Sequence, residues 1–396
     1  MQGDEIHIGF GIHDKTGTYC SWLGAAIQSI VEHSDANMCF HVLHDESLTD
    51  DNIEKLHYVV GKHRICFHLL DASVFTSLEE QLKGYTIGAM FRVKLPEVLS
   101  DLERVIYLDA DLFVNRDIEE LWNTDIDDYY MAAVPDIDVY HGIIKPNPVR
   151  DGEVEAKQYF NSGVLYMNLA LIREKGDMGQ EILQYLAEHK DSDLPDQDAL
   201  NVIYRDKIRY LDFSWNCFVK RERRLGQKGI SEQIYHYVGT RCLLYYLSEY
   251  DFAYFETMNR TPWGQVECDK ILKHSMERVL DINYKQEMLL RQVSRADKKF
   301  IFYGEETGAM RNVYDIVTIR EGDYRVLDNP IEDPYARLSC RPLSAIMEEK
   351  EAFAVFVLPQ ADGGSAIRNL EKMGLKLDED FFTIPRMLMP HKGGYV

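Results

Sequence analysis

The sequence predicts an α/β fold built on a mixed, mostly parallel sheet, followed by a small second α/β domain. Apolar runs of strand length alternate with segments of helical periodicity from the N-terminus onward, as in strands joined by crossover helices. Near residue 290 a locally basic stretch, RQVSRADKK, precedes a new strand and glycine turn in FIFYGEETGAM. We therefore expect one domain over residues 1–285 and a second over residues 290–396.

The bulk composition is that of an ordinary globular protein, with 45% hydrophobic and 28% charged residues. The net charge of −22 disfavours nucleic acid as a partner, because a polyphosphate surface requires clustered Lys and Arg. No run reaches the roughly 18 apolar residues of a membrane span, and the N-terminal sequence has no signal-peptide pattern. Seven scattered cysteines without a CxxC pair indicate reduced thiols. These features predict a cytoplasmic protein without a transmembrane segment.

Apolar runs bounded by polar residues predict the strands of the first half. They are Ile6–Ile12, Met38–His44, Ile65–Leu70 and Val105–Leu108. Between the second and third runs, Asp51 and Glu54 have the spacing of a capping box, and apolar residues then recur on one helical face. This segment is therefore predicted to be a crossover helix.

Later segments continue the alternation. We expect a strand over Gly163–Asn168, an amphipathic helix over Met178–His189, and a turn at Asp196–Asp198. In the last hundred residues, AFAVFVLPQADGGSAIRNLEKMGL again follows the order of strand, turn and helix. Gly304 and Gly308 do not form the GxGxxG pattern that a dinucleotide pyrophosphate requires, so this second domain is predicted to act without a dinucleotide.

Two carboxylates, Asp109 and Asp111, directly follow the strand that ends at Leu108. In open α/β sheets the ligand crevice lies beyond the carboxyl ends of the strands. Paired carboxylates in this position suit Mg²⁺ or Mn²⁺, which can bridge them to a diphosphate. A lone DxD also arises by chance in solvated loops, so the motif alone leaves both interpretations open.

A series of motifs in fixed order makes the reading more specific. They are HDKTGTY, MFRVKLPEVL, VIYLDADLFV, YFNSGVLYMNL, LPDQDALN and IYHYVG. With these motifs the chain resembles glycosyltransferase family 8, the family of glycogenin and the bacterial lipooligosaccharide galactosyltransferases, over residues 5 to about 260. The resemblance implies a GT-A type nucleotide-sugar-binding fold. It also implies a retaining, metal-dependent enzyme that moves a hexose from UDP-galactose or UDP-glucose to a carbohydrate acceptor.

The resemblance also assigns a metal site. Asp109 and Asp111 would be ligands together with His236 of IYHYVG. An imidazole beside two carboxylates favours Mn²⁺, with Mg²⁺ as the alternative. Taken alone, His236 would be read as a strand histidine with its hydrogen bonds satisfied. Acceptors such as lipopolysaccharide would bring this cytoplasmic protein to the inner membrane face.

Donor-binding residues follow from the same resemblance. Asp14 would read the uracil edge and Tyr19 would stack on its face, although a packing role for Tyr19 stays open. The guanidinium of Arg92 would hold the sugar and phosphates, because its planar fork suits oxygen acceptors. The remaining donor contacts would come from Asn161, Ser162, Asp196, Gln197, Gly239 and Arg241.

For the chemical step, the family pattern places Gln197 on the attacking face. An amide is too weak a nucleophile to act like the carboxylates of retaining hydrolases. Front-face substitution, in which the departing phosphate helps to deprotonate the acceptor hydroxyl, is the better hypothesis. Asp196 would then orient the sugar or stabilise its developing charge.

One departure from the family pattern leaves alternatives open. After HYVG the family commonly continues with lysine, proline and tryptophan, whereas this chain reads Thr240-Arg241-Cys242. Arg241 could replace the diphosphate-binding lysine. The departure also leaves room for a catalytically inactive nucleotide-sugar-binding scaffold, and the C-terminal region for an NAD-linked oxidoreductase. The Tyr-rich stretch LLYYLSEYDFAYF could line an acceptor site, but packing is the preferred interpretation.

Overall fold

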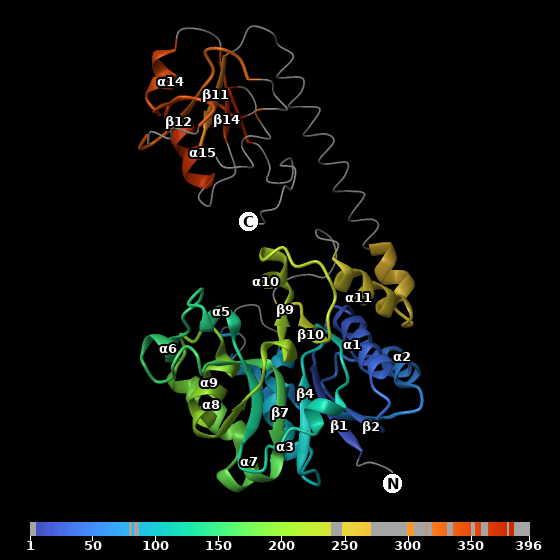
Figure 1. The fold of residues 1–396 in the computed structure, drawn as a ribbon. Coiled ribbons are helices and arrows are strands. Elements are labelled where there is room, and N and C mark those ends of the chain that lie inside the picture. The colour runs from blue at the N-terminus through green and yellow to red at the C-terminus, as the bar shows by residue number, and fades with distance from the viewer. Residues whose placement is uncertain are drawn as a thin grey trace. The chain divides into compact units, whose positions relative to one another are not determined.

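The computed structural model describes residues 5–78, 81–82, 87–238, 248–270, 299–304, 314, 319–330, 336–349, 353–357, 363–377 and 380–383. The chain divides into two compact units, residues 1–271 and 272–396, each of which has its own sheet (Figure 1). The boundary expected between residues 285 and 290 lies outside the described residues.

The first unit is built on a seven-stranded mixed sheet, and this confirms the predicted fold class. β3 (Arg64–Leu69), β2 (Met38–His44), β1 (Ile6–Ile12) and β4 (Arg104–Leu108) are parallel neighbours in that order. β7 (Phe160–Asn168) runs antiparallel to both β4 and β6 (Met131–Pro135), and β8 (Ile208–Tyr210) closes the edge beside β6. The predicted strand bounds hold to within one residue for the first four strands.

Helices cover both faces of this sheet (Figure 1). α1 (Tyr19–His33) and α2 (Asp50–Val60) pack on the face formed by alternate residues such as Ile8 and Phe40. The opposite face, which includes Leu43 and Leu165, packs against α3 (Leu95–Val98), α7 (Leu169–Lys175), α8 (Met178–Glu188) and α9 (Pro195–Tyr204). Successive side chains of a strand point to opposite faces, so each covered strand reads as a nearly continuous apolar run.

A second, three-stranded sheet positions part of the site. β10 (Gln233–His236) pairs antiparallel with β5 (Leu112–Asn115) and parallel with β9 (Cys217–Phe218). α11 (Glu249–Asn259) packs Tyr250 and Tyr254 into the adjoining core, so the described end of the Tyr-rich stretch is packing. The shorter elements are η1 (Ala72–Leu78), η2 (Ile87–Lys94), α4 (Glu119–Trp122), α5 (Ile137–Tyr140), α6 (Asn147–Arg150), η3 (Arg205–Lys207), η4 (Phe213–Trp215) and α10 (Val219–Arg224).

Two local predictions were wrong. The cap of α2 is Thr49, whose side chain accepts a hydrogen bond from the Asn52 backbone amide, so the helix begins before the capping box expected at Asp51. Asp196–Asp198 form the first turn of α9 instead of a loop turn. Pro195 at the first helical position needs no backbone N–H there, and carboxylates are favoured near a helix N-terminus.

The second unit is a five-stranded parallel sheet, as expected for a small α/β domain. Its order is β13 (Cys340–Pro342), β12 (Tyr324–Leu327), β11 (Lys299–Tyr303), β14 (Phe353–Val357) and β15 (Phe381–Thr383). α14 (Ala345–Glu348) and α15 (Gly363–Lys372) pack on it around a core of its own. The strand order reverses direction between β11 and β14, as in doubly wound folds.

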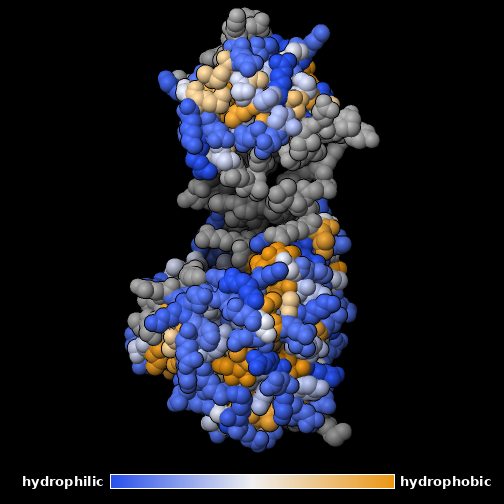
Figure 2. All heavy atoms as spheres, turned by 90° about the vertical axis from the view of Figure 1, so that its left-hand side faces the viewer, coloured by the Kyte–Doolittle hydropathy of each residue, from blue (hydrophilic) through white to orange (hydrophobic). Residues whose placement is uncertain are grey.

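The surface and the thiols add little to these assignments. The face seen in Figure 2 is mostly hydrophilic, with apolar residues in small separate patches. None of the described helices has the length and apolarity to cross a bilayer. The described cysteines are free thiols.

Candidate active site

A cavity of about 380 Å³ opens at the carboxyl ends of β1 and β4. Most of the residues predicted for the site line it, and they come from all six of the sequence motifs. They are Tyr19, Arg92, Asp109, Asp111, Asn161, Ser162, Asp196, Gln197 and His236. Gly239 and Arg241 lie outside the described residues, and Asp14 lies behind Tyr19 without lining the cavity.

Strand pairing brings His236 to the two aspartates. β4 ends just before Asp109, and β5 begins just after Asp111, so both carboxylates lie at a junction between the two sheets. The antiparallel pairing of β10 with β5 sets His236 opposite Leu112. The His236 Nε2 atom lies 3.2 Å from Asp111 Oδ1 and 3.8 Å from Asp109 Oδ2. One ligand atom from each of the three residues lies within 4.8 Å of the others.

Hydrogen bonds behind the cavity fix the tautomer of His236. Asn161 Oδ1 accepts from the Gly163 amide at 3.0 Å, so the Asn216 amide nitrogen donates to the same oxygen at 2.8 Å. The Asn216 oxygen then faces His236 Nδ1 at 2.8 Å, and that nitrogen must donate. The Nε2 lone pair is therefore left facing the two carboxylates. This arrangement requires a positive charge between them, either a proton on Nε2 or a metal ion.

The ionisation of the three groups is coupled. Burial raises the pKa of Asp109; Arg92 opposes this and the Asp111 charge adds to it, so the net shift is upward. Burial also raises the pKa of Asp111, but the charge of His236 and its hydrogen bond outweigh burial and lower the value. Burial lowers the pKa of His236, yet Asp111 and Asp109 raise it overall. The two carboxylates thus favour a positive charge on or beside His236.

Arg92 is a buried guanidinium that joins three parts of the site. Its Nη2 lies 2.9 Å from Asp109 Oδ1, and its Nε lies 3.3 Å from Asp196 Oδ2. Its Nη1 donates to the Ser162 carbonyl, and the side chain lies over the Tyr107 ring at 4.7 Å. The hydroxyl of Tyr107 donates to Asp109 Oδ1 at 2.8 Å. Asp109 is thereby held on one side while its Oδ2 faces His236.

Gln197 is fully hydrogen-bonded at the floor of the cavity. Its Oε1 accepts from Asn161 Nδ2 at 2.9 Å and from the Ser162 amide at 3.0 Å. Its Nε2 donates to Asp136 Oδ2 at 3.2 Å. Ser162 Oγ lies 3.1 Å from Asp196 Oδ2. The amide of Gln197 is therefore held rigidly, and burial raises the pKa of the Asp136 carboxyl beside it.

Comparison with known sequences decides the family. A sequence model described as Glycosyl transferase family 8 matches residues 14–241, more than half of the chain. The chain belongs to glycosyl transferase family 8. The predicted family is thereby confirmed, and the matched segment contains every residue described above.

Curated relatives of this family 8 chain share about a quarter to a third of its residues. General stress protein A of Bacillus subtilis (strain 168) is 30% identical over 228 residues, covering 55% of this chain and 76% of that protein. Lipopolysaccharide 1,2-glucosyltransferase of Escherichia coli is 28% identical over 273 residues, covering 63% and 78%. Lipopolysaccharide 1,3-galactosyltransferase of Salmonella typhimurium is 24% identical over 292 residues, covering 66% and 80%.

The fold of this family 8 chain is similar to that of a solved glycosyltransferase. The galactosyltransferase LgtC, in complex with donor and acceptor sugar analogs, superposes with a TM-score of 0.56 over 65% of this chain and 96% of that chain. The two sequences are 22% identical. At that identity the comparison supports the fold alone, which agrees with the predicted GT-A type architecture.

The side chain of Asp14 does not reach the cavity, in contrast to its expected role as a donor-binding residue. Its Oδ1 accepts from the Tyr19 amide at 2.8 Å and its Oδ2 from Asn52 Nδ2 at 3.0 Å. Asn52 Oδ1 in turn accepts from Trp263 Nε1 at 3.0 Å. Asp14 Oδ1 therefore holds the start of α1, and Oδ2 ties it to Asn52 on α2, which together fix the position of Tyr19 in the cavity wall. The Tyr19 pKa is raised to about 12, by burial and then by the charges of Asp111 and Asp109.

Several residues of this family 8 site were not singled out from the sequence. Tyr107 and Gly163 lie inside recognised motifs, but Asp136 and Asn216 lie in segments without a motif. A Cβ on Gly163 would lie 2.4 Å from His236 Cε1 and 2.7 Å from Asp109 Oδ2. The site thus requires glycine at position 163. This glycine is part of the NSG motif, but the spacing of the motif residues did not show why glycine is needed.

Proposed function

We propose that this family 8 chain is a retaining, metal-dependent glycosyltransferase that moves a hexose, galactose or glucose, from a UDP-sugar to a carbohydrate acceptor. The single observation that carries the proposal is the orientation of His236. Its Nε2 lone pair faces Asp109 and Asp111 because Asn216 occupies its other nitrogen. Two carboxylates and an imidazole directed at one point suit a divalent cation.

The three ligand side chains fit Mn²⁺, with Mg²⁺ as the alternative. Asp109, Asp111 and His236 would hold the ion, and its remaining coordination positions would go to oxygen atoms of the nucleotide-sugar and to water. When bound, the ion supplies positive charge that stabilises the departing diphosphate. Arg92 cannot take over this task by itself, because its guanidinium is already shared between Asp109, Asp196 and backbone carbonyls.

The donor sugar would lie against the floor formed by Asn161, Ser162, Asp196 and Gln197. Ser162 Oγ and the Asp196 carboxylate can bind sugar hydroxyls, because both line the cavity. The uracil would lie near Tyr19, whose ring lines the same cavity. Asp14 would act on this pocket through Tyr19, since its Oδ1 holds the start of α1 and its Oδ2 is bound by Asn52 on α2. Gly239 and Arg241 remain proposed diphosphate contacts.

Retention of configuration is proposed to follow front-face substitution. The Gln197 amide is engaged at both ends, so it orients neighbouring groups and does not attack the anomeric carbon. The Asp196 carboxylate, which Arg92 keeps near the cavity, would stabilise positive charge that develops on the sugar ring. The acceptor hydroxyl would lose its proton to the departing phosphate oxygen.

The acceptor class is inferred from the relatives. Two of them are named as lipopolysaccharide glycosyltransferases, one for glucose and one for galactose. A glycan or surface-polysaccharide acceptor is therefore proposed, which would be met at the inner face of the membrane. The second unit is proposed as an accessory domain that docks this acceptor, because the family match ends at residue 241.

The test is release of UDP from a panel of UDP-sugars with and without Mn²⁺, together with NMR assignment of the anomeric configuration of the product. The proposal predicts turnover of UDP-galactose or UDP-glucose that needs the metal and gives a retained linkage. A scaffold would bind UDP and Mn²⁺ without turnover. An inverted product would refute the front-face mechanism but leave the metal site in place.

A further inference from the structure

A second cluster of metal-ligating side chains lies at the opposite end of the strands from the DxD motif. His7 is near the start of β1, and Cys39 and His41 are in the first half of β2. The parallel register pairs His7 with Cys39 and Gly9 with His41. All three residues alternate with core residues such as Ile8 and Phe40, which face α1 and α2. The three side chains therefore share the other face of the sheet.

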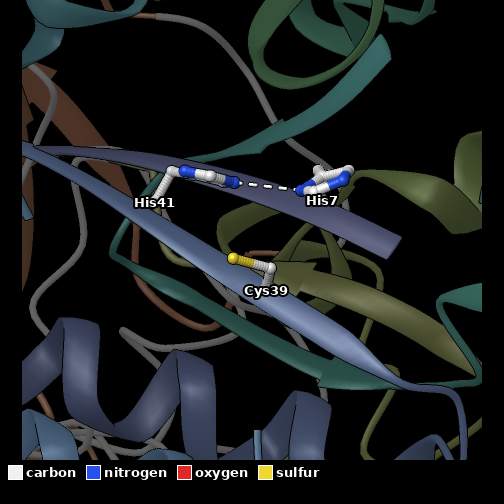
Figure 3. A group of neighbouring side chains, drawn as sticks. All are labelled: His7, Cys39 and His41. Carbon is white, nitrogen blue, oxygen red and sulfur yellow. Dashed lines mark hydrogen bonds between the residues drawn. The ribbon is translucent and has the colours of Figure 1, made fainter. Parts of the chain in front are cut away.

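The three side chains converge on one point (Figure 3). His7 Nδ1 and His41 Nε2 lie 3.1 Å apart, with their rings directed toward one another and the Cys39 thiol beside the gap. One ligand atom from each residue lies within 4.8 Å of the other two. Zinc bonds of about 2.0 Å to nitrogen in a tetrahedral site put two ligand nitrogens about 3.3 Å apart. The observed separation of 3.1 Å between His7 Nδ1 and His41 Nε2 is close to this ligand-to-ligand distance.

A third imidazole lies behind His41. The His41 Nδ1 atom is 3.1 Å from His68 Nε2 on β3, and the two rings are stacked with centroids 5.4 Å apart. If Nδ1 donates to His68, the Nε2 of His41 carries the lone pair that faces His7 and Cys39. Histidines that bind metals ordinarily donate their second ring nitrogen to an acceptor in this way. His68 is thus a positioning residue for His41.

Burial keeps these imidazoles neutral, as ligands must be. It lowers the pKa of His41 to about 3, with further lowering by His7, His68 and Arg64. It also lowers the pKa of His7 and of His68. Burial and the nearby Cys66 raise the pKa of the Cys39 thiol to about 12, so metal binding would release its proton.

We propose that His7, Cys39 and His41 form a zinc site that ties β1 to β2, separate from the DxD centre. A thiolate with two imidazoles selects a borderline-soft cation, whereas the two carboxylates at Asp109 and Asp111 suit a harder one. His7 is partly exposed, which gives the ion a route in. The fourth position goes to water.

The competing interpretation is a metal-free chain of hydrogen-bonded imidazoles from His7 through His41 to His68. Such a chain satisfies the same nitrogens with one proton between each pair. In it the Cys39 thiol contacts Cys66 and takes no part in the chain of imidazoles, and the chain would not change when a metal is added. A probe that reports specifically on a metal–thiolate bond therefore separates the two interpretations.

The experiment titrates the full chain with Co²⁺ as a spectroscopic substitute for Zn²⁺. A thiolate ligand gives a charge-transfer band in the near ultraviolet, which a site of carboxylates and one imidazole lacks. We expect one equivalent of thiolate-bound Co²⁺, displaced by Zn²⁺, in the wild type and in Asp109→Asn/Asp111→Asn. The band should be absent in Cys39→Ser and kept in the control Cys268→Ser, whose thiol contacts Asn259 instead.

Histidine variants complete the test. His7→Ala should weaken Co²⁺ binding by more than tenfold, and His68→Ala by about 10- to 100-fold, because the loss of an orienting partner costs that much. His57→Ala, which removes an exposed imidazole of α2 that packs on Phe67, should bind as the wild type does. The proposal is overturned if the wild type shows no thiolate band at saturating Co²⁺. It is also overturned if a folded His7→Ala variant binds Co²⁺ as tightly as the wild type. This second criterion applies even if Cys39→Ser fails to fold.

Discussion

Asn216 offers a sharp test of the candidate metal centre, because it does not line the cavity and reaches it through Asn161 and His236. Its oxygen accepts from His236 Nδ1 at 2.8 Å, and its nitrogen donates to Asn161 Oδ1 at 2.8 Å. Replacement by leucine removes the acceptor that keeps the His236 Nε2 lone pair toward the aspartates. The buried Nδ1–H would then lack a partner, and the other tautomer or a rotated ring would compete.

Loss of such an orienting partner weakens metal binding by about 10- to 100-fold. This range corresponds to about 1.4–2.8 kcal/mol, which is also the cost expected for one unsatisfied buried polar group. The matched control is Asn216→Asp, which keeps the acceptor for His236 Nδ1 but removes the donor to Asn161. We expect Asn216→Asp to bind Mn²⁺ at least as tightly as the wild type, because a carboxylate raises the basicity of the imidazole.

The assay is calorimetric titration of Mn²⁺ into the full chain, with circular dichroism to verify that each variant is folded. A folded Asn216→Leu variant with wild-type affinity would show that His236 is not held by Asn216. If both variants weaken Mn²⁺ binding equally, the metal affinity depends on the hydrogen bond from Asn216 to Asn161 and not on the acceptor for His236.

Three further predictions follow from other parts of the chain. His236→Ala should weaken Mn²⁺ binding, with turnover partly restored at high metal concentration; a lowered melting temperature with unchanged metal affinity would indicate a structural histidine instead. Residues 1–285 should bind UDP and hydrolyse the donor, while transfer to the natural acceptor should need residues from about 290 onward; a folded truncation that does not bind UDP would refute this division. Burial lowers the pKa of His63, whose Nε2 has no partner, so only the unfolded chain binds its proton and stability should fall as the pH drops below 6.5. His63→Asn should flatten that dependence in denaturant titrations, and an unchanged slope would contradict it.

Local sequence patterns predicted the sheet well, because strands buried on both faces read as apolar runs whose ends are marked by polar residues. β1 and β2 have the predicted bounds. The first turn of α9 was missed, since the polar segment from Asp196 to Asp198 resembles a loop and its helical conformation depends on Pro195 and on packing of the following turns. Helix propensity alone did not distinguish a loop from the first turn of a helix in this segment.

The site was predictable only where a motif carried it. Asp109 and Asp111 follow a buried strand, and their position is a local feature. His236 comes close to the two aspartates because β10 pairs with β5. No local sequence pattern predicts this pairing, and His236 was assigned to the site only through the family resemblance. Asp136 and Asn216 reach the site from loops at other strand ends, so their roles appear only when the tertiary hydrogen bonds are known.

The most direct test of the proposed function compares UDP release by the wild type and by Asp109→Asn/Asp111→Asn, with Mn²⁺ and either UDP-galactose or UDP-glucose. Both carboxylates line the cavity, and Asp196 still pairs with the buried Arg92 in the double variant, so we expect it to fold, which circular dichroism verifies. Loss of metal charge stabilisation worth several kcal/mol should reduce turnover by at least about 1000-fold. A folded double variant that releases UDP at the wild-type rate with Mn²⁺ would contradict the assignment of this site as the metal-dependent catalytic centre.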